Sequence, residues 1–301
     1  MLLAVQTLHS LQCRVGSAVD WQPSSDPDMV RANMSQKALQ EPQHNHLLAA
    51  LKPAVQGRLY PHLKLVRLPL RTTLGESGCA LQHLYFPTDS IISLQYVTED
   101  GESSAISLVG NEGLLGVSVC LGGDAAPSRM LVQSAGYAYR LPVAKVKDEF
   151  GRHGQLLLLM LRFTQALIAQ VGQTAACNRH HTIEQRLCRW LLLSVDRSQT
   201  NQLTMTHEYV GQMLGARREG VTEAASRLRQ MGVITYSRGS VRVINRSKLE
   251  SLSCECYGSV RKETDRLLGE YSGHSPNSSV STSRRPVVAA SGALSARPGW
   301  L

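Results

Sequence analysis

The chain has 301 residues, of which 43% are hydrophobic, enough to bury the core of one or two globular domains. No stretch approaches the roughly 20 uninterrupted apolar residues of a membrane span. The first residues also lack the basic start of a secretory signal. We therefore expect a cytoplasmic protein without a membrane partner, whose translation could begin at Met1, Met29 or Met34.

The seven cysteines are scattered, odd in number and contain no CxxC pair. This pattern argues against a disulfide scaffold and against a zinc site, and it suits a reducing compartment. We predict no metal ligands from it.

The net charge of +9 is concentrated in one segment. Residues 178–248 hold twelve Lys or Arg and five Asp or Glu, whereas residues 1–177 hold fourteen and thirteen. Eleven of the twelve cations are Arg, which suits bidentate contacts with phosphate and guanine. The segment is a candidate for nucleic-acid binding, and a solvated basic face with no partner is the alternative.

The first half of the chain predicts a flexible extension and then a β domain. Residues 1–43 are polar without a sustained period, and a short helical turn is expected over 45–55. Six short runs follow, several alternating apolar and polar, with Gly, Pro or Asp at the joints: 63–70, 80–87, 90–98, 104–110, 130–136 and 137–142. This spacing over 44–142 predicts an all-β sandwich, barrel or roll rather than a βαβ domain.

The period changes at Val143, from which apolar residues recur at intervals of three, four and seven. Residues 143–175 therefore predict one long helix of about 45 Å. Such a helix is longer than any small domain it could pack on, so we expect part of it to form a two-stranded coiled coil in a homodimer. Burial of the whole helix against the β domain is the alternative. We expect the dimer interface at Leu157, Leu161, Thr164, Ile168 and Val171.

The most informative motif lies at residues 204–231, after a further helix expected over 183–195. Thr206 is a good N-cap for a helix over 207–214, Gly215 suits a tight turn, and a second helix is expected over 217–231. Its buried face would contain Val221, Ala224, Ala225 and Leu228. Two short β runs around Arg238 follow and resemble a wing.

Residues 178–248 thus predict a winged helix-turn-helix whose second helix enters the major groove. An αα-hairpin packed in a core is the alternative. It has less support because the first turns of the second helix carry charged side chains on the face opposite Val221 and Ala225. The expected base-reading residues are Arg217, Arg218, Glu219 and Thr222, because Arg suits guanine and Glu can accept from cytosine N4. The expected contacts to the DNA backbone are Thr206, His207, Arg227 and Arg238.

The order of these elements, with GQMLGARREGVTEAASRL in the helix-turn-helix, resembles the Crp/Fnr family of bacterial transcription regulators over about 44–257. The resemblance implies an α+β fold: an N-terminal double-stranded β-roll sensor of the cyclic-nucleotide-binding type, a long dimerisation helix and a C-terminal winged helix-turn-helix. Implied partners are double-stranded DNA with a palindromic operator, a second copy of the chain and RNA polymerase.

Within this resemblance, Arg218 and Glu219 fall where the family has its guanine-reading Arg and cytosine-contacting Glu. Glu223 stands where the cyclic-AMP receptor branch has a second base-reading Arg. We therefore do not expect this protein to read the DNA half-site sequence of that branch.

The family's ligand patterns are incomplete in this chain. Val117 follows Gly116 where nucleotide binders have Glu, and residues 127–129 do not reproduce their Arg-Ser/Thr-Ala run. Arg129 could serve only if the loop shifts, so we expect no cyclic nucleotide. Cys13 alone gives no ligand set for an iron–sulfur cluster, and the histidines at 44, 46, 62 and 83 are too scattered to indicate haem. We identify no cofactor.

Other functions have less support. No GxSxG, HExxH, Walker or GxGxxG pattern occurs, so we do not expect an enzyme. A ligand-binding or protein-interaction module that does not act through DNA is the alternative function. Residues 272–301 are rich in Ser, Pro and Gly and predict a disordered tail.

Overall fold

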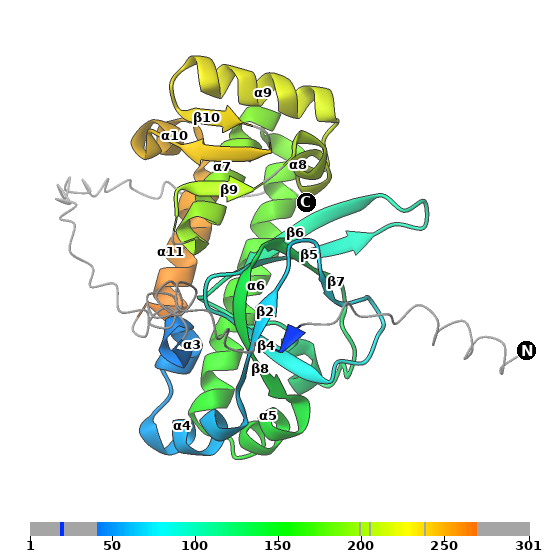
Figure 1. Ribbon diagram of the computed structural model, residues 1–301, viewed down its shortest axis with the longest axis vertical. Coiled ribbons are helices and arrows are strands. Elements are labelled where there is room, and N and C mark those ends of the chain that lie inside the picture. The colour runs from blue at the N-terminus through cyan, green and yellow to red at the C-terminus, as the bar shows by residue number, and fades with distance from the viewer. Residues whose placement is uncertain (1–18, 21–40, 199, 205, 238, 270–301) are drawn as a thin grey trace, which may run out of the picture.

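A computed structural model describes residues 19–20, 41–198, 200–204, 206–237 and 239–269. In Figure 1 a β-roll lies at the lower end and a smaller helical and β region at the upper end, and the long helix α6 (Gln155–His180) runs between them. The predicted tail at 272–301 and most of the predicted extension at 1–43 lie outside the described residues.

Two four-stranded antiparallel sheets form the β-roll, with strand orders β1-β2-β8-β4 and β3-β7-β5-β6. The strands are β1 (Val19–Asp20), β2 (Lys64–Leu68), β3 (Thr73–Gly75), β4 (His83–Pro87), β5 (Ile91–Val97), β6 (Ser103–Val109), β7 (Arg129–Ser134) and β8 (Gly136–Pro142). All six expected runs form strands. The strands β1 and β3 were not expected, and β1 lies in the predicted flexible extension, where it pairs with β2.

Short helices precede the strands or lie between them: η1 (Pro42–His44), α3 (His46–Ala49), α4 (Pro53–Leu59), η2 (Tyr60–His62) and η3 (Val117–Cys120). The fully buried Asn45 ties α3 to the β-roll, since its side chain caps α3 and its Nδ2 donates to the carbonyls of Pro87 (3.0 Å) and Gly113 (2.8 Å). A buried amide with all these partners avoids the desolvation cost of an unpaired polar group.

The prediction of a single helix over 143–175 is wrong. The segment forms α5 (Val143–Phe150) and, after a break, α6, which continues to His180. The break contains Gly151 and Gly154, and His153 has a left-handed φ of 53°. Glycines on both sides of a left-handed residue end one helix and start another.

The helix α6 has a buried face of Leu156, Leu159, Met160, Phe163, Ala166, Gln170, Thr174 and Cys177. The ring of Phe163 fills the space that a side chain at Gly113 would need, so that glycine lets α6 pack closely on the β-roll. Length and composition alone would allow α6 to cross a membrane. Its buried face instead packs on β6 and on α11 (Glu255–Leu268), which runs beside it.

The upper region contains α7 (Ile183–Arg197), α8 (His207–Leu214), α9 (Arg218–Gln230) and α10 (Arg246–Leu252), with a small antiparallel sheet of order β10-β11-β9. Its strands are β9 (Gln202–Thr204), β10 (Ile234–Ser237) and β11 (Ser240–Val243). The core of this region also includes Ile91, Ala105 and Leu108 of the β-roll. Three strand residues of the β-roll thus belong to the core of the upper region, whereas the other buried apolar side chains of the β-roll form a separate core.

Candidate nucleic-acid interface

The helices α8 and α9 form the expected helix-turn-helix. The Thr206 hydroxyl caps α8 by accepting from the Tyr209 amide at 3.2 Å, and Gly215 ends it with a left-handed φ of 56°. A side chain at Gly211 would meet the carbonyl of Ala216 at 2.8 Å, so this glycine permits the tight turn. Local capping and two glycines thus fix the angle between the two helices.

The helix α9 has one buried and one exposed face. Val221, Ala224, Ala225 and Leu228 are buried, as expected, and anchor the helix against α7 and α8. The expected base-reading residues Arg217, Arg218, Glu219 and Thr222 are all exposed near its N-terminal end. Among the described residues, the side chains of Arg217, Arg218 and Glu219 make no ion pair. Three charged groups are thus available to an external ligand.

The Thr222 hydroxyl is already engaged within the protein. It donates to the Arg218 carbonyl at 2.9 Å and lies 3.0 Å from Nδ1 of His207. The His207 ring in turn stacks on Tyr236 of β10 with ring centroids 4.5 Å apart. His207 therefore joins α8, α9 and the wing, and burial, with a smaller effect of the Arg218 charge, lowers its pKa.

Two of the expected contacts to the DNA backbone, Arg227 and His207, already have partners within the protein. The Arg227 guanidinium pairs with Glu184 at 2.8 Å and with Glu223 at 2.9 Å. The His207 ring contacts Thr222 and Tyr236, although its Nε2 atom is buried without a hydrogen-bond partner in the described part of the chain. Arg238 lies outside the described residues, although β10 and β11 on either side of it form the expected hairpin, in which Ser237 pairs with Ser240.

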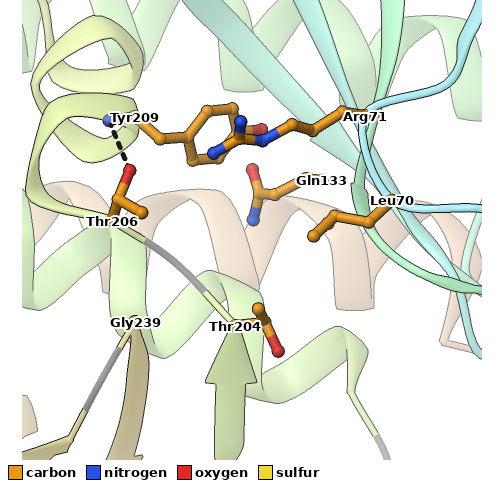
Figure 2. Close-up of a pocket in the computed structure, with 7 residues that line it drawn as sticks. All are labelled: Leu70, Arg71, Gln133, Thr204, Thr206, Tyr209 and Gly239. Atoms are coloured by element: carbon orange, nitrogen blue, oxygen red, sulfur yellow. Dashed lines mark hydrogen bonds between the residues drawn. The ribbon is translucent and has the colours of Figure 1, made fainter.

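Thr206 lines a cavity of about 210 Å³ between the helix-turn-helix and the β-roll. Figure 2 shows its wall from the β-roll, with Leu70, Arg71 and Gln133, opposite Thr204, Thr206, Tyr209 and Gly239. Arg71 has a left-handed φ of 64°, a strained conformation for a residue other than glycine. Thr206 thus caps α8 at the side where that helix meets the β-roll.

Buried and partly buried polar contacts hold the helix-turn-helix on the β-roll. The Arg197 guanidinium at the end of α7 pairs with Glu112 at 2.7 Å, and the two side chains are only 7% and 15% exposed. Gln95 of β5 donates to the sulfur of Met213 in α8 at 3.5 Å. The helix α8 is therefore positioned by the β-roll as well as by α7 and α9.

The expected dimer residues lie on a separate stripe of α6. Leu161 and Ile168 are 46% and 60% exposed, and Leu157, Thr164 and Val171 are partly buried. These five positions and Ala175 alternate at spacings of four and three residues, the pattern of a coiled-coil seam. In one protomer this stripe has apolar side chains in contact with solvent.

The segment that the resemblance associates with nucleotide binding borders a small apolar cavity of about 50 Å³, lined by residues such as Leu81, Val117, Ser128 and Leu167. Small-molecule pockets commonly measure about 300–1,000 Å³. The Arg129 guanidinium is paired with Glu76 at 2.9 Å. An anionic ligand would have to displace this carboxylate to reach Arg129.

Sequence reasoning missed a group of four side chains that could hold a metal ion: Cys177, His181, Cys254 and Cys256. Cys177 and His181 are far in the chain from Cys254 and Cys256, and the two pairs meet because α11 packs on α6. The CxC pair at 254–256 was the available signal, but nothing in the sequence places it beside Cys177. The sequence pattern argued against a disulfide scaffold, and it did not indicate that Cys79 is disulfide-bonded.

Comparisons with known proteins agree with this geometry. Residues 185–252 match the family model of the Crp-like helix-turn-helix domain. FixK2 from Bradyrhizobium japonicum is similar in structure with a TM-score of 0.55 and 14% identity, covering 64% of this chain and 98% of that one. No curated protein sequence matches the chain.

Two further structures give the same result. A CRP-family transcriptional regulator from Thermus thermophilus has a TM-score of 0.53 and 18% identity, covering 62% of this chain and 95% of that one. The c-di-GMP responsive global regulator CLP from Xanthomonas campestris has a TM-score of 0.52 and 14% identity, and the match covers 64% of this chain and 99% of that one. The chain therefore has the fold of a Crp/Fnr-type transcription regulator and contains a Crp-like helix-turn-helix DNA-binding domain.

Proposed function

We propose that the protein is a homodimeric, cytoplasmic transcription regulator that reads a palindromic operator with α9, under the control of a signal received at the β-roll. One observation carries the proposal: Arg217, Arg218 and Glu219 are exposed and without ion pairs, within the described residues, at the N-terminal end of α9. Side chains at this end of a recognition helix reach base edges. RNA polymerase is the partner through which bound protein would change transcription.

The division of labour in this proposal follows the chain. Residues 44–142 receive the signal, the stripe on α6 within 143–175 pairs two protomers, and 178–248 bind DNA. The α6 stripe supports the dimer because it is apolar, partly exposed and spaced for a coiled coil. Two-fold symmetry then requires inverted half-sites about one helical turn, roughly 34 Å, apart.

The proposed signal is not a cyclic nucleotide. The cavity bordered by the segment that the resemblance associates with nucleotide binding is small and apolar, and the nearby Arg129 is neutralised by Glu76. A buried phosphate needs unpaired donors to replace its lost hydration. Titration of the protein with cyclic AMP and cyclic GMP in a calorimeter should therefore release no heat of binding, and saturable binding would contradict this part of the proposal.

Selection from random duplexes tests the function as a whole. We expect an enriched inverted repeat whose affinity falls steeply with salt, because Arg side chains displace counterions from phosphates. An enriched site without symmetry would contradict the dimeric reader. Recovery of no sequence, with no salt-dependent binding, would favour a module that acts without DNA.

A further inference from the structure

The end of α6 and the start of α11 bring four soft metal ligands together. Cys177 lies in the last turn of α6, and His181 is its C-cap residue, four positions later on the same face. Cys254 is the N-cap residue of α11, and Cys256 lies in its first turn. The helix α11 lies beside α6 (Figure 1), so the two pairs face each other.

The distances between these ligand atoms suit one tetrahedral ion. The Sγ atoms of Cys177 and Cys254 are 3.6 Å apart, and Cys256 Sγ is 3.4 Å from His181 Nδ1. All four ligand atoms lie within 4.8 Å of one another. Bonds of about 2.3 Å to sulfur and about 2.0 Å to nitrogen give tetrahedral edges of about 3.5–3.8 Å. An ion at the centre would need only small side-chain movements.

The outer contacts are those that metal ligands commonly have. The second ring nitrogen of His181, Nε2, lies 3.3 Å from a carboxylate oxygen of Glu255. The Gln173 amide donates to Cys256 Sγ at 3.1 Å. A carboxylate behind a ligating histidine fixes the ring orientation and raises its basicity, and a donor to sulfur stabilises the thiolate.

The buried charges beside the cluster also call for an anion. Arg186 and Arg189 of α7 are 8% and 5% exposed, and Nη1 of Arg189 donates at 3.1 Å to the hydroxyl of Thr174, which lies one turn before Cys177 on α6. Neither forms an ion pair with a carboxylate in the described ranges, and the Nε atoms of both lack a hydrogen-bond partner there. Three thiolates around a divalent cation carry one net negative charge. A metal-bound cluster would therefore balance cations that are costly to bury alone.

We propose that Cys177, His181, Cys254 and Cys256 form a Cys₃His site for one Zn²⁺ ion, which clamps the C-terminal helices to the end of α6. Three sulfurs and one imidazole with no open position are the ligand set of a structural zinc site. An iron–sulfur cluster fits less well, because its ligands bind different iron atoms and must lie further apart. A Cys177–Cys254 disulfide would leave Cys256 and His181 without a role and the two arginines without an anion.

Metal analysis of the full-length, untagged protein tests the site. We expect about one zinc per chain and, after replacement by Co²⁺, the intense visible bands of a tetrahedral site with a sulfur-to-cobalt charge-transfer band. Cys256→Ser and His181→Ala should lose the metal or bind it far more weakly. Cys188→Ser is the matched control, since Cys188 is fully buried in α7 but is not among the four ligands and should keep the metal.

A milder variant separates metal binding from folding. Glu255→Gln should lower zinc affinity by about tenfold in a chelator competition while leaving the circular dichroism spectrum unchanged. Chelator should also lower the melting temperature of the wild type but not that of Cys256→Ser. Equal zinc content in the wild type and Cys256→Ser would overturn the proposal. So would a metal-free protein with a Cys177–Cys254 disulfide after anaerobic purification. Zinc content is measured without DNA, so the site and the proposed function can fail independently.

Discussion

The N-terminal end of α9 and the C-terminal end of α6 both gather polar side chains, but they present them in opposite directions. Arg217, Arg218 and Glu219 are exposed and make no ion pairs within the described residues. Cys177 and Cys254 are 0% and 4% exposed and point toward each other. Under the two proposals this difference separates two kinds of binding: the exposed groups contact an external ligand, whereas the buried convergent groups enclose an internal one.

Loss of the dimer should be the most severe way to break the proposed DNA reader. Replacing both Leu161 and Ile168 with Lys places two charges in the α6 seam, so we expect monomers and loss of operator binding. Sedimentation and operator titration measure both effects. The control is Ala169→Lys with Ala176→Lys, because each position lies about 100° around the helix from a seam residue. A dimeric Leu161→Lys/Ile168→Lys protein would place the interface elsewhere.

The α9 end can be tested at a single base pair. We expect Arg218→Ala to cost about 1–3 kcal/mol of operator binding and to relax the preference at one base pair, because a bidentate contact with guanine is lost. Arg238→Ala should instead weaken all duplexes alike and lower the salt slope by about one. Competition titrations with single-base operator variants distinguish the two. Equal weakening of operator and random DNA by Arg218→Ala would refute its base-reading role.

Arg227 lies on α9 like Arg218, but its guanidinium already has partners within the protein, so the two arginines can be compared directly. Since its guanidinium pairs with Glu184 and Glu223 and is half exposed, we expect Arg227→Ala to lower the free energy of unfolding by about 0.2–1 kcal/mol. We expect a smaller loss of operator affinity than for Arg218→Ala. Glu184→Gln should free part of this cation and strengthen binding to random DNA. A larger loss of affinity for Arg227→Ala than for Arg218→Ala would show that Arg227 leaves its carboxylates in the complex.

The smallest expected effect is a pH dependence at His207. Its pKa is lowered from 6.5 because burial disfavours the charged ring, so the unfolded chain binds the proton more readily. The free energy of unfolding should therefore be highest above pH 6.5 and should decrease as pH falls through 6.5 toward the lower folded value. Urea titrations at about pH 7.5 and about pH 5.5 should show a smaller decrease for His207→Asn than for the wild type. An identical decrease would assign the effect to other groups.

The predictable parts of the fold were those set by local sequence. Alternating runs gave the six expected strands, and Thr206, Gly215 and the apolar spacing of α9 gave the helix-turn-helix. The break at 151–154 was missed because hydrophobic spacing continues on both sides of Gly151 and Gly154. Contacts made by long-range packing were not predicted: the meeting of Cys177 with Cys254 and the pairing of Arg227 with Glu184 depend on how helices pack. The second partner of Arg227, Glu223, is an i,i+4 neighbour within α9 that the sequence spacing could have indicated.

The three β-roll residues in the core of the upper region have a consequence for dividing the molecule into fragments. Ile91, Ala105 and Leu108 lie on strands but belong to the apolar cluster of the upper region, where β6 packs against α7 and α8. A fragment beginning at α7 would expose the apolar surface that these residues cover, and such surface promotes aggregation. The intact chain should accordingly melt in one cooperative transition, and the DNA-binding half expressed alone should become soluble only when the apolar surface left uncovered is made polar.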